Sequence, residues 1–200
     1  YKSEPTCSEG DGYSMLGAVA MADKPTFDGL WLWVHDNAMN KVKRYSDCQE
    51  SSPEYRYSQL PGWENVANSN ENSAADGDFD IALALLCAYK QWGEFMGVND
   101  ACGNPISYKQ AAIDFIKALT DTLIFVSNGS TWLSGDIGFD GYFKGGDSWQ
   151  EMTDWANDPA RSGVNIESKG PQEQWFDYIA PSYFRQFGDF LSEIDSAKYA

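Results

Sequence analysis

An acidic, glycine-containing segment opens the first apolar helix that the sequence predicts: Ser8-Glu9-Gly10-Asp11-Gly12-Tyr13-Ser14-Met15-Leu16. It places the Glu9 carboxyl group at the start of a helix rich in small residues. Another apolar helix opens in the same way, with the residues Ala75-Asp76-Gly77-Asp78-Phe79-Asp80. Because both helix starts carry acids, they predict two walls of one site, where a carboxylic acid can donate a proton to a bound ligand.

A structural interpretation of the same acids stays open at this level. Glu9 can simply complement the helix dipole, a contribution of about 0.3–1 kcal/mol, and the local sequence favours that interpretation by about two to one. Ser73 precedes Asp76 by three residues, which is the spacing of a capping box. Ser8 and Asp11 repeat that spacing. A helix start stabilises a charged carboxylate, whereas a proton donor must hold its proton, so a second carboxylate or desolvating aromatic rings would have to compensate.

Helical periodicity predicts an all-α chain. The expected helices cover residues 8–22, 26–40, 73–92, 107–123 and 181–194. Residues 81–89 are apolar on every side, which predicts a helix buried by neighbours on all faces. Residues 41–72 read as a long surface excursion and residues 97–106 as a loop. Short strand-like segments are expected around Trp132-Leu133 and Phe139.

Small residues are expected to serve two purposes in the first helix. Gly17, Ala18 and Ala20 are small enough to let a neighbouring helix approach closely. Gly10 and Gly12, on either side of Asp11, are expected to leave room for a ligand beside Glu9.

Charge and composition exclude several classes of partner. A formal net charge of −16 argues against nucleic acid and against an anionic membrane surface. No apolar run reaches the ~20 residues that span a bilayer. Aromatic residues make 15% of the chain and include 8 Trp, which offers stacking surfaces for sugar rings as well as core. The acidic balance and four cysteines, which permit three pairings, favour a secreted protein in an oxidising compartment.

No metal or other cofactor is expected. A single histidine and the lack of a Cys-x-x-Cys pair argue against a structural zinc site. The alternating acids of residues 76–80 are similar to the start of an EF-hand loop, which requires Gly at its sixth position and Glu at its twelfth. Ile81 and Cys87 stand at those positions, so calcium is rejected in that form.

Five segments, in the expected order, resemble glycoside hydrolase family 8. They are Ser8-Glu9-Gly10-x-Gly12-Tyr13-x-Met15-Leu16, Phe27-Asp28-x-Leu30-Trp31-x-Trp33, Ser73-Ala74-x-Asp76-x-Asp78-x-Asp80-Ile81-Ala82, Gly146-Asp147-x-Trp149 and Pro181-Ser182-Tyr183-Phe184. The resemblance implies an (α/α)6 barrel, of which this chain would hold only part. It also implies hydrolysis with inversion of β-1,4-linked glucan, xylan or chitosan.

The resemblance also implies roles for individual residues. Glu9 matches the general acid, which protonates the leaving glycosidic oxygen, and Asp76 matches the acid that holds the sugar at the point of cleavage. Trp149 and Tyr183 match aromatic residues of the active cleft, with Trp149 as a stacking surface. Trp63 matches another stacking tryptophan less closely, since the loop before Asp76 is longer here.

One family segment has no counterpart. The family's general base lies in an Asp-Ala-x-Arg-x-Pro segment after the Ser-Tyr-Phe helix, and no such segment occurs before Ala200. We therefore expect residues 1–200 to form part of a single catalytic domain of this family, with a second chain as one way to complete the barrel. The expected activity is endo-hydrolysis of a cellulose-type β-1,4-glucan. The alternatives are a xylanase or chitosanase of the same family, or a carbohydrate-binding protein that has lost the base.

Overall fold

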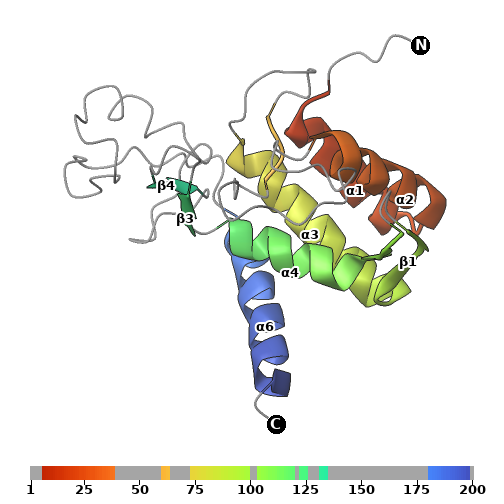
Figure 1. The fold of residues 1–200 in the computed structure, drawn as a ribbon. Coiled ribbons are helices and arrows are strands. Elements are labelled where there is room, and N and C mark those ends of the chain that lie inside the picture. The colour runs from red at the N-terminus through yellow and green to blue at the C-terminus, as the bar shows by residue number, and fades with distance from the viewer. Residues whose placement is uncertain are drawn as a thin grey trace.

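The computed structural model describes residues 6–38, 60–63, 73–99, 103–119, 122–125, 131–134 and 180–198. Most of these residues are helical, which confirms the expected class (Figure 1). The helices are α1 (Ser8–Ala20), α2 (Lys24–Trp33) with its π-helical continuation η1 (Val34–Ala38), α3 (Ala75–Trp92), α4 (Tyr108–Ala118) and α6 (Pro181–Lys198). Two antiparallel hairpins join β1 (Phe95–Asn99) to β2 (Pro105–Ser107) and β3 (Thr122–Phe125) to β4 (Thr131–Ser134).

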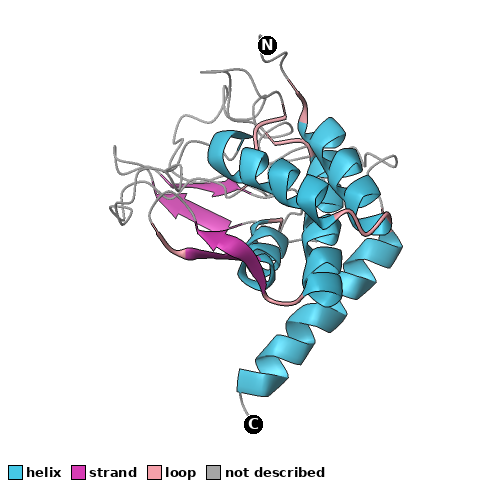
Figure 2. Cartoon of the chain, turned by 90° about the vertical axis from the view of Figure 1, so that its right-hand side faces the viewer, coloured by secondary structure: helices cyan, strands magenta, loops and turns pink. Residues whose placement is uncertain are grey.

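Helix α3 forms the centre of the fold. It contacts α1 on one side and α4 on another, and α6 packs against it near the carboxyl end of the chain (Figures 1 and 2). Ile81 and Leu85 are fully buried and Leu83 is only 8% exposed, which confirms the predicted burial of this helix on all faces. Among the described helices, none combines the length and the apolar character that crossing a membrane would need.

Helices α1 and α3 come together through two glycines near their N-terminal ends. A Cβ atom added to Gly77 would lie 2.5 Å from the backbone carbon of Ser8, and one added to Gly12 would lie 2.7 Å from the Cβ of Asp80. The expectation that Gly12 leaves room for a ligand is therefore wrong, because α3 occupies the space beside it. Gly17 has open space beside it and allows no close helix approach.

The two predicted capping boxes do not form. The residues that precede α1 and α3 are Cys7 and Ala74, both in extended conformation, and neither helix start has a side-chain cap. Ser8 is instead the first residue of α1 and is buried against Gly77, so its hydroxyl is directed into the helix crossing. Burial of the helix start by α3 overrides the local capping preference.

The segments expected to be loops hold more structure than their sequence indicates. Residues 97–99 belong to β1 and residues 105–106 to β2. Helix α4 ends at Ala118, and residues 122–125 form β3 instead of continuing the helix. The strand expected around Trp132-Leu133 is confirmed as β4, whereas Phe139 lies outside the described residues. Within the predicted excursion of residues 41–72, Leu60 is fully buried in the core.

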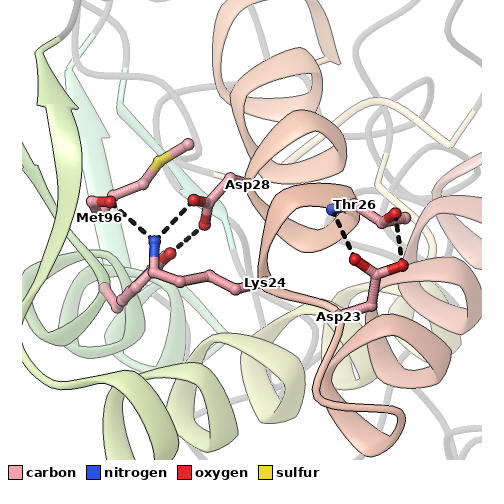
Figure 3. A network of polar contacts seen from close by, with 6 residues as sticks. Asp23, Lys24, Thr26, Asp28 and Met96 are labelled. Carbon is pink, nitrogen blue, oxygen red and sulfur yellow. Dashed lines mark hydrogen bonds and ion pairs between the residues drawn. The ribbon is translucent and has the colours of Figure 1, made fainter.

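A polar network ties α2, β1 and α4 together (Figure 3). The Lys24 ammonium group donates to the Asp28 carboxylate at 2.6 Å and to the backbone carbonyl of Met96 in β1 at 2.8 Å. The hydroxyl of Tyr108, the first residue of α4, also donates to Asp28. Burial and the Asp28 carboxylate raise the pKa of Tyr108 above its ordinary value. Lys24 thus links α2 to β1, and Asp28 links α2 to α4.

Candidate active site

The crossing of α1 and α3 brings the Glu9 and Asp76 segments together. A Cβ atom on Gly77 would lie 2.6 Å from the backbone nitrogen of Glu9, so the residue after Asp76 touches the residue that carries the other acid. Glu9 is exposed and Asp76 is half-buried. Burial raises the pKa of Asp76, the hydrogen bond from the Gly77 N–H at 2.8 Å lowers it, and the Glu9 charge raises it. The two helix starts therefore lie against each other, and the charge of Glu9 reaches the Asp76 carboxyl group.

Asp80 adds a second carboxyl group on the same face of α3. It follows Asp76 by four residues, one helical turn, and is only 8% exposed. Burial raises its pKa to about 6, and the negative charges of Asp76 and Glu9 act in the same direction. A hydrogen bond from the Tyr183 hydroxyl opposes this shift because it stabilises the charged form.

Two tyrosines from different helices face these acids. Tyr13 lies one turn after Glu9 on α1, is 59% exposed and donates its hydroxyl to Glu9. The Glu9 charge is the main cause that raises the pKa of Tyr13. Tyr183, in the first turn of α6, has a pKa raised by burial and by Asp80. We refer to Glu9, Tyr13, Asp76, Asp80 and Tyr183 together as the acidic junction.

Trp63 lies beside the acidic junction. Its backbone carbonyl accepts a hydrogen bond from the Ser8 N–H at 3.0 Å, directly before Glu9. The preceding Gly62 donates its N–H to the carbonyl of Ala38 at 3.1 Å, so the segment is held at both ends. The Trp63 side chain is 40% exposed, although a large apolar side chain would gain from burial. The backbone of Trp63 is thus held at the start of α1, and its partly exposed indole is available for stacking.

The structure brings together Glu9, Asp76, Tyr183 and Trp63 among the predicted site residues. Trp149 lies outside the described residues. Sequence reasoning missed Tyr13 and Asp80 as members of the site. The signal was present, since each stands four residues after a selected acid and thus on the same helical face.

The carboxyl groups of the acidic junction can hold and transfer protons. Within the described parts of the chain, no three His, Cys, Asp or Glu side chains gather in a way that could hold a metal ion. Cys7 and Cys87, the two cysteines that the structure describes, are free thiols. Asp76 and Asp80, whose pKa values burial raises, lie near the exposed Glu9 carboxyl group, and such a set of carboxyl groups suits general acid chemistry.

Several known proteins are similar to this chain in sequence or in fold. A beta-glucanase of Niallia circulans is 35% identical over 148 residues, which are 70% of this chain and 30% of that protein. An endoglucanase of Cellulomonas uda is 39% identical over 85 residues, which are 42% of this chain and 21% of that protein. The fold is similar to the crystal structure of a reducing end xylose-releasing exo-oligoxylanase, with a TM-score of 0.50 and 21% identity over 73% of this chain and 33% of that one.

The chain thus spans about a third or less of the length of these relatives. The sequence model of the glycosyl hydrolases family 8 matches residues 2–161, which is most of the chain. Together with the fold, a match of this extent shows that the described helices are part of an (α/α)6 barrel and that the chain belongs to glycosyl hydrolases family 8.

Proposed function

We propose that the protein containing these residues hydrolyses β-1,4-linked glucan of the cellulose type, within the polymer and with inversion of the anomeric configuration. The observation that carries this proposal is the close crossing at Gly77 and Gly12, which puts the Glu9 and Asp76 segments side by side. Such a pair of helix starts gives an exposed acid and a half-buried acid on one surface.

Glu9 is proposed as the general acid that protonates the leaving glycosidic oxygen. Its exposure lets it reach a ligand, and the Tyr13 hydroxyl that donates to it restrains its carboxyl group. Asp76 is proposed to hydrogen-bond the sugar at the point of cleavage, a task for which its raised pKa and half-buried position suit it. Inversion needs a base about 6.5–9.5 Å from the acid, with a water between them. We assign no base within residues 1–200.

Exposed aromatic residues support a sugar chain as the ligand. The partly exposed Trp63 indole, whose backbone is held at the start of α1, is proposed to stack against one sugar ring. Trp149 and Tyr183 are proposed as further aromatic contacts of the cleft. The similarity to a beta-glucanase and an endoglucanase favours glucan over xylan and chitosan. Because cellulose-type glucan is a polymer found outside cells, we also propose that the protein is secreted.

The proposal is tested on the full-length protein that contains residues 1–200. Soluble β-1,4-glucan, xylan and chitosan are each incubated with it, and new reducing ends are measured alongside the solution viscosity. Glucan is expected to give the fastest release, with an early fall in viscosity that marks internal cleavage. Proton NMR of the first products should show the α-anomer.

Three outcomes would contradict the proposal. Release of the β-anomer first would exclude inversion, since an inverted β-linkage gives the α-anomer. Faster release from xylan or chitosan would show that glucan is not the preferred substrate. Binding of glucan without any release would indicate a carbohydrate-binding protein.

A further inference from the structure

Asp80 is the member of the acidic junction to which the proposed hydrolysis gives no role. Its side chain is 8% exposed and carries a carboxyl group into the packed contact between α1 and α3. A Cβ atom on Gly12 would lie 2.7 Å from the Asp80 Cβ, so the α1 backbone closes one side of this residue. Burying a carboxyl group is costly unless the group has a specific hydrogen-bond partner.

That partner comes from α6. The Tyr183 hydroxyl donates a hydrogen bond to Asp80 and thereby links the first turn of α6 to the first turns of α3. Apolar rings hold the rest of α6 on α3, since Phe184 packs edge-on against Phe79 at 5.0 Å between centroids. The Tyr183 ring itself packs against Phe187, and the hydrogen bond to Asp80 gives its hydroxyl a specific partner.

We propose that Asp80 is a positioning residue, which holds the Tyr183 hydroxyl at the acidic junction and makes that position depend on whether Asp80 is ionised. This inference rests on the proposed function, because it concerns an aromatic residue of the same cleft. Asp80 itself need not touch the sugar. It acts through Tyr183, and Gly12 keeps it in place.

Burial, together with the neighbouring charges, sets the pH at which this control operates. Glu9 from α1 and Asp76 on α3 face Asp80 with negative charge, and the Tyr183 and Tyr13 hydroxyl groups face it from α6 and α1. Burial is the main cause that brings the pKa of Asp80 to about 6. Above that pH the carboxylate accepts the Tyr183 hydrogen bond strongly, and below it protonation weakens the bond.

The first test measures the pair without any need for activity. Carbon-13 NMR of aspartate carboxyl groups in the full-length protein should show Asp80 titrating near pH 6, assigned by its loss in Asp80→Asn. In Tyr183→Phe the Asp80 midpoint should rise, because a donor that stabilises the charged form is gone. Asp114→Asn is the matched control: Asp114 is also partly buried, with its pKa raised by burial, but it bonds Gln110 on α4. That control should leave the Asp80 midpoint unchanged.

The second test measures the role in the reaction. If glucan hydrolysis is present, Asp80→Asn should remove the step near pH 6 from the pH profile of kcat. Asp80→Ala, which also removes the acceptor, should lower kcat about 10- to 100-fold, as misplaced groups do. Asp114→Asn should keep the profile of the unmodified protein.

The two tests separate the failure of each proposal. An Asp80 midpoint in the ordinary range, or one that Tyr183→Phe leaves unchanged, overturns the pairing whatever the activity. A confirmed pair with an unchanged pH profile in Asp80→Asn overturns the role in the reaction. Absence of hydrolysis together with the expected midpoints counts against the proposed function and leaves the pair of Asp80 and Tyr183 standing.

Discussion

Gly77 and Gly12 matter at the scale of the single residue because they decide how closely α1 and α3 approach. Each lies where a methyl group would meet the opposite helix at less than 3 Å. At Gly77 the nearest atoms belong to the backbone at Ser8 and Glu9, which cannot rotate away as a flexible side chain would. The position of Glu9 beside Asp76 thus depends on the absence of one side chain.

Gly77→Ala is expected to destabilise the fold. Forcing a methyl group into a packed contact typically costs about 1–3 kcal/mol, against a gain of up to about 1 kcal/mol from better helix propensity. We expect a net loss in the free energy of unfolding, measured by urea denaturation.

Gly17→Ala is the matched control. Gly17 lies in the interior of α1 with open space beside it, so the same substitution should raise stability by about 0.5–1 kcal/mol. If the two variants changed stability in the same direction and by the same amount, the close approach at Gly77 would be wrong.

Single residues were predictable from the sequence where a motif or a helical period named them. Glu9 and Asp76 were selected as acids at helix starts, and the structure places their segments in contact. Asp80 followed from the same spacing rule but was not selected, since its pairing with Tyr183 joins residues 103 positions apart. The role of Gly12 was misjudged because sequence alone does not show what occupies the space beside a glycine.

At the scale of elements, a continuous apolar run predicted α3 as a buried helix, and its burial confirms this. The β1–β2 and β3–β4 hairpins were less visible. Residues 97–106 contain Asn, Asp and Gly, which are typical of loops, although residues 97–99 and 105–106 belong to the paired strands β1 and β2. The helix predicted to reach residue 123 ends at Ala118, and residues 122–125 form β3, which pairs with β4.

Asp28→Ala is expected to weaken the polar network that connects α2, β1 and α4. It removes the acceptor for both Lys24 and the hydroxyl of the fully buried Tyr108. Leaving a buried donor unpaired costs about 1–3 kcal/mol, so the free energy of unfolding should fall by that order.

Asp189→Ala provides the comparison for that loss. Asp189 is an exposed aspartate on α6, and its replacement should change stability by no more than about 0.5 kcal/mol. Equal stability of the Asp28 and Asp189 variants in thermal or urea unfolding would show that the network of Figure 3 contributes nothing.

At the scale of the whole molecule, periodicity alone predicted helices but not their arrangement. The barrel followed from the order of the family motifs, and the family match over residues 2–161 together with the similar fold confirms it. The helices bury their apolar faces around α3, and the acids gather where α1, α3 and α6 begin. We propose that this gathering is a proton-donating site with Glu9 as the donor.

The most direct measurement compares Glu9→Gln with Glu94→Gln in the full-length protein, on soluble β-1,4-glucan. Both substitutions remove one exposed carboxyl group, but Glu94 lies after the far end of α3, next to Gly93. If Glu9 is the general acid, Glu9→Gln should lower kcat by about 10²–10⁴-fold with little change in KM, because the glutamine has no acidic proton to donate. Glu94→Gln should keep the activity of the unmodified protein. Near-full activity in Glu9→Gln would show that Glu9 is not the proton donor.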